Sequence, residues 1–118
     1  IPLSTLVDYM PFWEPAAAER VGKTRYIDMA VKHLEQYIHR YPGQHACFIF
    51  ELCQGEGGFK IGDRDYLKAL MDVCKAHRIA VWDDEIQTFG RLPRMFAYEY
   101  LDLGEYVDVF CVVKMTQA

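Results

Sequence analysis

The chain has 118 residues, of which 52% are hydrophobic and 25% are charged, and its formal net charge is -4. This composition is ordinary for one soluble globular domain, and the negative charge argues against a nucleic-acid or anionic-membrane surface, which needs a basic patch. No apolar run reaches the roughly 20 residues that cross a bilayer, and no signal-peptide pattern is present.

Residues 1–46 predict an irregular segment followed by a helix. Prolines and a glycine interrupt residues 1–22, which is typical of an irregular segment. Between residues 24 and 41, apolar side chains return every third or fourth position, so they share one helical face. These side chains are Ile27, Val31, Leu34 and Ile38. Residues 42–43, a Pro-Gly pair, end the predicted helix.

Residues 47–118 predict a βαβαβ core. Residues 47–52 form an apolar run typical of a strand, and a helix capped by Asp63 or Asp65 follows. The next elements are a strand over residues 79–82, a loop over residues 88–93, a short helix over residues 95–101 and a strand over residues 107–113. Alternating strands and helices predict a parallel sheet in an α/β fold.

Charged residues follow all three predicted strands. Glu51 ends the first strand, residues 83–85 are an Asp-Asp-Glu triplet after the second, and Lys114 follows the third. Open parallel sheets bind ligands outside the carboxyl ends of their strands, so we expect an active site at this edge. Taken singly, the triplet is more often a solvated cluster or a helix cap. Lys114 alone is typical of a solvated strand end.

A buried carboxylate in this triplet requires a cationic partner, for which a protonated heterocycle and a lysine are both candidates. Adjacent strand residues face opposite sides, so the three acids cannot share one role. A lysine beside a partly apolar pocket can lose its charge and attack carbonyl groups.

The glycine-rich residues 54–58 are not a convincing phosphate-binding loop. They lack both the G-x-G-x-x-G order and the Lys-Ser/Thr pair of a P-loop, and residues 59–62 separate them from the next helix. A tight turn that lets the backbone approach another group fits this stretch better.

The four cysteines and four histidines do not predict a disulfide framework or a metal site. Cys47, Cys53, Cys74 and Cys111 show no C-x-x-C pairing. We expect them to be reduced, buried thiols of a cytoplasmic protein. The histidines lack finger-like spacing to them, which argues against zinc.

Three blocks of sequence, residues 50–58, 82–91 and 108–114, together resemble class III aminotransferases. These are pyridoxal-phosphate enzymes of the aspartate-aminotransferase fold (PLP fold type I). The blocks have the family's order and spacing, and the resemblance runs from about residue 48 to residue 114. It implies that residues 1–118 are a fragment of the parallel-sheet, three-layer large domain, which binds the cofactor.

The resemblance also implies roles for residues at the cofactor. Lys114 matches the lysine that holds the cofactor aldehyde as a Schiff base, and Asp84 matches the carboxylate that pairs with the pyridinium nitrogen. Ile86 stands where a valine usually packs on the ring. Gln87 is similar to the residue that hydrogen-bonds the ring hydroxyl or the lysine region. Asp84 would keep the ring nitrogen protonated, and Lys114 would act as the general base.

Two glutamates belong to the substrate region in this resemblance. Glu51 and Glu56 match those of the family's E-x-x-Q-G-E-x-G block. In ω-amino-acid members, the second glutamate can pair with a substrate-binding arginine. The implied reaction moves an amino group between an amino acid or ω-amine donor and a 2-oxo acid, in a homodimer.

The sequence departs from the family pattern at two places. Residues 88–91 are one residue shorter than the family's T-G-F-G-R, and residues 115–118 replace a glycine-rich stretch. The Thr-Gln pair at 116–117 faintly resembles lysine 6-aminotransferases. The family's phosphate loop, ring-stacking aromatic residue and substrate arginine have no counterpart here. We therefore expect the 118-residue piece alone to be inactive.

Other functions remain open at this point. An aminomutase or a decarboxylase of the same fold would carry residues like Asp84 and Lys114. A non-catalytic α/β binding module is a different class, although a scaffold has no need of a lysine at a buried strand end. A flavodoxin-like nucleotide-binding domain is a third possibility, weakened by the poor phosphate loop.

Overall fold

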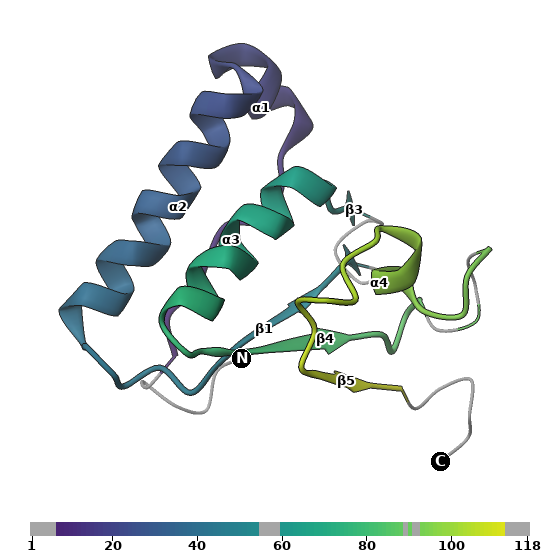
Figure 1. Ribbon diagram of the computed structural model, residues 1–118. Helices are drawn as coiled ribbons and strands as arrows, with labels where there is room; N and C mark the ends of the chain where they lie inside the picture. Colours follow the sequence, from purple (N-terminus) through teal and green to yellow (C-terminus); the bar gives the residue numbers. More distant parts are fainter. Residues whose placement is uncertain (1–6, 55–59, 89, 91–92, 113–118) are drawn as a thin grey trace.

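The computed structural model contains a three-stranded parallel sheet with helices packed on one of its faces (Figure 1). The structure describes residues 7–54, 60–88, 90 and 93–112. The helices are α1 (Pro15–Val21), α2 (Lys23–Arg40), α3 (Arg64–Ala76) and α4 (Ala97–Tyr100). The strands are β1 (Cys47–Glu51), β2 (Cys53–Gln54), β3 (Lys60–Ile61), β4 (Ala80–Asp84) and β5 (Val109–Cys111).

The sheet has the order β1-β4-β5, and both pairs of neighbouring strands are parallel. The predicted parallel α/β layer is therefore confirmed. β4 is the central strand and runs two residues further than predicted, so that Asp83 and Asp84 belong to it. The short strands β2 and β3 pair with each other in antiparallel fashion, and no sequence signal predicted them.

The two long helices lie side by side above the sheet (Figure 1). The predicted apolar faces are confirmed, since Leu34 and Ile38 of α2 and Leu67 and Leu70 of α3 are buried. Asp63 is the N-cap of α3, where its side chain accepts a hydrogen bond from the backbone N–H of Tyr66 at 3.0 Å. No helix in the described ranges is long and apolar enough to cross a membrane.

Residues 15–21 form helix α1, although residues 1–22 were predicted to be irregular. Proline at the first helical turn costs no hydrogen bond, because its missing N–H has no partner there in any helix. The segment continues with three alanines, and Ala18 is buried. Gly22, with φ of 94°, separates α1 from α2 and adopts a backbone conformation that favours glycine.

An aromatic cluster fixes the segment before α1 against the helices. The ring of Trp13 lies 5.3 Å from that of Tyr26 and 5.6 Å from that of Tyr66. The hydroxyl of Tyr66 donates a hydrogen bond to the carbonyl of Pro11 at 2.6 Å. Burial raises the pKa of Tyr66 to about 12, because the ionised phenolate would lose its hydration.

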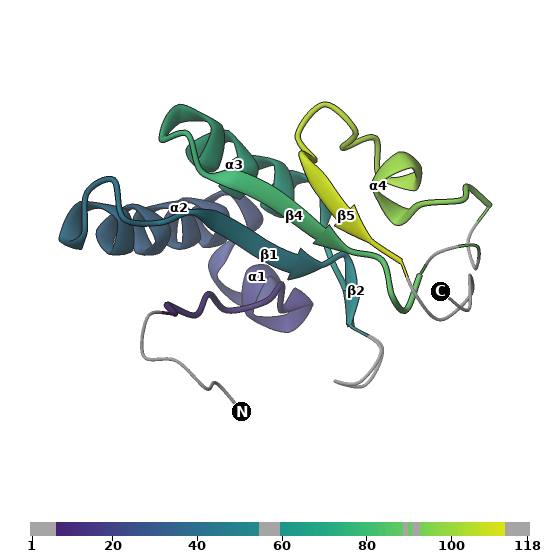
Figure 2. The same cartoon turned by 90° about the horizontal axis from the view of Figure 1, so that it is seen from below.

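The opposite face of the sheet carries an apolar row. Ile49, Trp82 and Val109 are register partners on β1, β4 and β5 and are 58%, 36% and 44% exposed. Figure 2 shows the sheet from this side, with the described helices beyond it. The sheet therefore has one face packed by helices and one face open, in the part of the chain that the structure describes.

The thiols are less buried than predicted. Cys74 of α3 is buried and Cys47 is exposed, whereas Cys53 and Cys111 are intermediate. The difference arises because Cys47 lies on the open face of the sheet. No group of three or more metal-ligating side chains in the described ranges is placed to hold a metal ion.

Candidate active site

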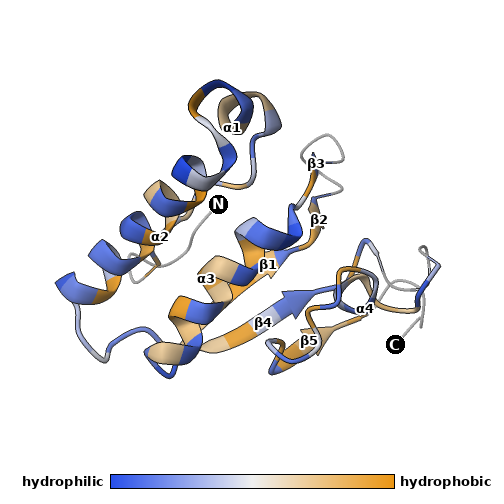
Figure 3. Ribbon diagram, turned by 45° about the horizontal axis from the view of Figure 1, so that its top comes forward, coloured by the Kyte–Doolittle hydropathy of each residue, from blue (hydrophilic) through white to orange (hydrophobic). Residues whose placement is uncertain are grey.

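The carboxyl end of β4 is the point at which the sheet changes from apolar to acidic. Figure 3 shows this strand hydrophobic at its start and hydrophilic at its end. Alternate strand residues point to opposite faces, so Asp84 shares the open face with Trp82, whereas Asp83 shares the helix-covered face with Val81. Asp83 is accordingly fully buried and Asp84 only partly buried. The triplet thus divides between two environments.

Asp84 lies in a row of three polar side chains across the sheet. Its Cα partners are Glu51 on β1 and Cys111 on β5. Parallel strands bring their carboxyl ends to one edge, so the structure places the predicted residues Glu51 and Asp84 together, as expected. Cys111 was not predicted to belong to this row. Burial raises the pKa of its thiol, which is therefore neutral at pH 7.

The backbone after β4 orients the Asp84 carboxylate. Its Oδ1 accepts a hydrogen bond from the N–H of Ile86 at 2.9 Å. The N–H of Glu85 donates to the carbonyl of Cys111 at 3.0 Å, which continues the pairing with β5 beyond the strand itself. Ile86 and Gln87 follow in the turn and are partly buried. A carboxylate fixed in this way suits a cationic ring nitrogen.

Hydrogen bonds to the Glu85 side chain connect this turn to helix α4. Glu85 is fully buried, and its Oε1 accepts hydrogen bonds from the Thr88 hydroxyl at 2.5 Å and the Ala97 N–H at 2.7 Å. Its Oε2 accepts a third hydrogen bond from the N–H of Tyr98 at 3.2 Å. Sequence reasoning did not find this role, although the alternation of Val81, Asp83 and Glu85 on one strand face was the available signal.

Asp83 departs from the expectation that a buried carboxylate here has a cationic partner. Neither of its oxygens has a hydrogen-bond partner among the described residues, and none of its surface is exposed. Burial, and then the neighbouring Glu85 and Asp84, raise the pKa of Asp83 to about 10. Burial without a partner therefore favours the uncharged form of this side chain, and that form needs no cation.

Two of the predicted site residues, Lys114 and Glu56, lie outside the described residues. Their roles remain predictions from the sequence. Lys114 follows the last residue of β5, Cys111, by three positions.

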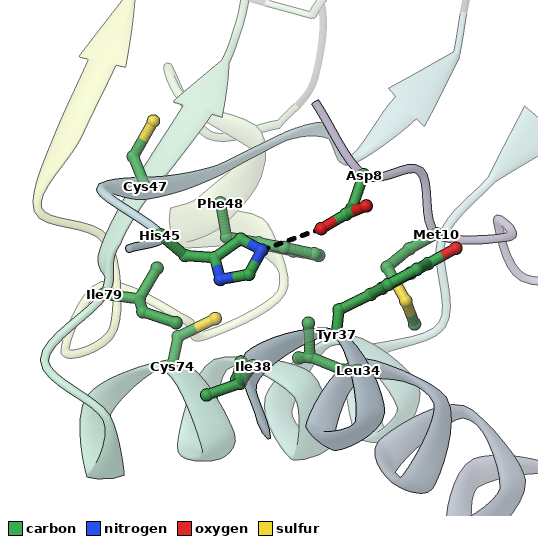
Figure 4. A pocket seen from close by; sticks show the side chains of 10 residues that line it. All are labelled: Asp8, Met10, Leu34, Tyr37, Ile38, His45, Cys47, Phe48, Cys74 and Ile79. Carbon is green, nitrogen blue, oxygen red and sulfur yellow. Dashed lines mark hydrogen bonds and ion pairs between the residues drawn. The ribbon is translucent and has the colours of Figure 1, made fainter. Parts of the chain in front are cut away.

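A small pocket lies at the other end of the sheet (Figure 4). Cys47 and Ile79, at the amino ends of β1 and β4, line it together with His45. His45 Nε2 lies 2.8 Å from a carboxylate oxygen of Asp8, as the dashed line in Figure 4 marks. This pocket is separate from the edge that carries Asp84, so it is not the predicted site.

Comparison with known proteins assigns the family. The model of the aminotransferase class-III family matches residues 6–118. The acetylornithine aminotransferase of Methanocaldococcus jannaschii is 46% identical over 70 residues, which cover 58% of this chain and 17% of that protein. The chain therefore belongs to the class III aminotransferase family, and the recognition made from the three sequence blocks is confirmed.

Solved transaminase structures share the fold. The lysine aminotransferase from Mycobacterium tuberculosis in the internal aldimine form superposes with a TM-score of 0.75 at 26% identity, covering 96% of this chain and 24% of that one. The ω-transaminase from Pseudomonas jessenii in complex with PMP superposes with a TM-score of 0.68 at 31% identity. The match covers 75% of this chain and 20% of that one. The fold is thus the α/β fold of PLP fold type I. The chain spans about one fifth of the length of these relatives.

Proposed function

We propose that this chain is part of the large domain of a pyridoxal-phosphate-dependent aminotransferase. The enzyme would transfer an amino group between an amino acid or ω-amine donor and a 2-oxo acid. The observation that carries the proposal is the position of Asp84, which stands beside Glu51 at the carboxyl edge of the sheet with its carboxylate oriented by the Ile86 N–H. Family membership supports the same reaction.

When bound, pyridoxal phosphate supplies an electron sink for the carbon that carries the amino group. The part of Asp84 is to hold a proton on the ring nitrogen, because a nearby carboxylate favours the cationic form. Ile86 would border the ring through its side chain while its N–H keeps Asp84 in place. Gln87, in the same turn, would donate or accept a hydrogen bond at the ring hydroxyl.

Lys114 is proposed as the residue to which the cofactor aldehyde is attached, as a Schiff base, and as the base that moves the substrate proton. Lysine suits both tasks, because its amine is a nucleophile toward carbonyls once it loses its charge. Glu51 and Glu56 are proposed for the substrate region. A homodimer in the cytoplasm, with small amine and 2-oxo acid substrates, completes the proposal.

The test is an absorbance spectrum of the full-length protein with pyridoxal phosphate, before and after borohydride reduction, followed by peptide mapping. We expect a visible or near-visible band that borohydride abolishes and a phosphopyridoxyl group on Lys114. A Lys114→Ala variant is the matched control and should give no adduct at this peptide. If the wild type gives no adduct, or one on another lysine, the binding-module alternative is favoured. Substrate profiling of the full-length protein separates an aminotransferase from an aminomutase or a decarboxylase.

A further inference from the structure

Asp83 occupies an unusual place for a carboxyl group. It lies in the centre of the sheet, and its register partners on the two neighbouring strands are Phe50 and Phe110. The ring of Phe110 packs in turn on Phe96, with centroids 4.7 Å apart, and lies 5.9 Å from that of Tyr98. This aromatic surrounding has no dipoles that would replace the hydration of an ionised carboxylate.

The nearest polar group on the same strand face is Glu85, two residues further on. Glu85 accepts three hydrogen bonds, from Thr88, Ala97 and Tyr98. These three donors give the Glu85 carboxylate the hydrogen-bond partners that Asp83 lacks among the described residues. Two ionised carboxylates are acceptors only, and they would repel each other without water between them. An ionised Asp83 would therefore be left without a hydrogen-bond partner among the described residues.

A single proton on Asp83 would remove the repulsion between the two carboxylates and would also give Asp83 a hydrogen-bond partner. Protonated Asp83 becomes a hydrogen-bond donor, and the buried Glu85 carboxylate, two residues further on along the same face, is the neighbouring acceptor. Carboxyl pairs that share one proton are a known consequence of two acids held close together in a buried site.

We propose that Asp83 is protonated at neutral pH and donates a hydrogen bond to Glu85, and that this pair positions Asp84 between them. The inference rests on the proposed function only where it concerns the cofactor. Asp83 and Glu85 flank Asp84 in the chain and lie on the opposite face of the strand, where α4 anchors Glu85 through Ala97 and Tyr98. Loss of the proton would set two charges against each other and loosen the turn whose Ile86 N–H orients Asp84.

The first test measures protonation in the full-length protein without cofactor. Infrared difference spectra at pH 7 between the wild type and Asp83→Asn should contain the carbonyl band of one carboxylic acid, present only in the wild type. Asparagine keeps a donor toward Glu85 but has no titratable proton. Asp28→Asn, at a side chain that is 69% exposed, is the matched control and should leave the band unchanged. If the acid band is also present in Asp83→Asn, the proposal that Asp83 is protonated is wrong.

The second test measures positioning through the affinity for pyridoxal phosphate. Asp83→Leu removes the donor and should raise the dissociation constant about tenfold, the equivalent of one lost hydrogen bond to a charged group. At pH 7 the dissociation constant of Asp83→Asn should be close to that of the wild type. At more alkaline pH the dissociation constant of the wild type should rise, whereas that of Asp83→Asn should not change. If the dissociation constants of the wild type and Asp83→Asn change with alkaline pH in the same way, the positioning role is overturned. This comparison holds even if Asp83→Leu does not fold. A wild type that binds no cofactor would refute the proposed function but leave the infrared result valid.

Discussion

Asp108 and Val81 are joined by two hydrogen bonds that fix where β5 begins against β4. The N–H of Asp108 donates to the carbonyl of Val81 at 2.9 Å, and Oδ2 of Asp108 accepts from the N–H of Val81 at 2.8 Å. Lys75 of α3 donates to the other carboxylate oxygen at 2.6 Å. A slip of one residue would turn every side chain of β5 to the other face. This contact therefore helps to bring Cys111 beside Asp84.

Asp108→Ala should lower the free energy of unfolding by about 1 kcal/mol, since it removes the acceptor for the Val81 N–H and the partner of Lys75. The value is small because the Asp108 side chain is 42% exposed. Urea unfolding of the full-length protein would measure it. Glu105→Ala, at an exposed residue, is the control and should change the midpoint little. A variant as stable as the wild type would show that backbone pairing alone sets the register.

The stabilisation that the Asp108 carboxylate contributes should decrease as the pH falls. The hydrogen bond from Lys75, together with that from Val81, lowers the pKa of Asp108 in the folded protein below its unfolded value. Its stabilisation is therefore complete above the usual pKa of an aspartate and is lost as the pH falls through the lowered pKa. The difference in unfolding free energy between the wild type and Asp108→Ala should shrink in that acidic range. A difference that grows on acidification would contradict the assignment.

Asp84→Asn should lower turnover of the full-length enzyme on the order of 100-fold or more while leaving the fold intact. An amide carries no charge to hold the proton on the ring nitrogen, although it can still accept a hydrogen bond from the Ile86 N–H. Steady-state rates with a range of amino donors, together with circular dichroism, would test this. Asp28→Asn serves as the control. Near-normal turnover in Asp84→Asn would remove Asp84 from its proposed role.

Glu85→Gln should destabilise the turn after β4 and the start of α4. Glutamine offers one acceptor oxygen and an NH2 group, and this NH2 group would face the backbone donor of either Ala97 or Tyr98. A buried donor left without an acceptor costs about 1–3 kcal/mol. Hydrogen exchange of residues 96–101 in the full-length protein should accelerate, whereas Glu105→Gln should not change it. Unchanged exchange would mean that Glu85 does not anchor α4.

The sequence was sufficient for the parts of this fold that depend on local pattern. The spacing of Leu34 and Ile38 identified α2, and the apolar run at residues 79–82 identified β4. The sequence offered Asp63 or Asp65 as the cap of α3, and the structure shows that it is Asp63. Because both residues follow apolar strand runs, the sequence also predicted that Glu51 and Asp84 lie at the same edge of the sheet, and the strand register confirms this. Each of these inferences needs only chain periodicity and the geometry of a parallel sheet.

Features that depend on partners distant in the chain were not predicted. The short helix α1 looked irregular because of Pro15, which is in fact at a position where proline is tolerated. Asp83 has no hydrogen-bond partner among the described residues, whereas Glu85 has donors at Ala97 and Tyr98, more than ten residues away in the chain. Likewise, Asp108 gains its role only when Val81 lies beside it. No local pattern marks such pairings.

Tyr66→Phe should destabilise the protein by about 1 kcal/mol at pH 7, because the Pro11 carbonyl loses its hydrogen bond from the Tyr66 hydroxyl. The pH dependence should change as well. The folded pKa of Tyr66 is raised to about 12, above the unfolded value of 10.0, so the folded state keeps this proton longer. Wild-type stability should therefore fall as the pH rises above that unfolded value, and this part of the fall should be absent in Tyr66→Phe.

Urea midpoints and tyrosinate absorbance between neutral and strongly alkaline pH would measure both effects in the full-length protein. Tyr41→Phe, at a side chain that is 51% exposed, is the matched control and should follow the wild type. Because Trp13 and Tyr26 pack against Tyr66, ionisation at this position must expose the aromatic cluster or leave a phenolate without hydration. A Tyr66 that ionises together with the exposed tyrosines would show that residues 7–14 are not held against the helices by this contact.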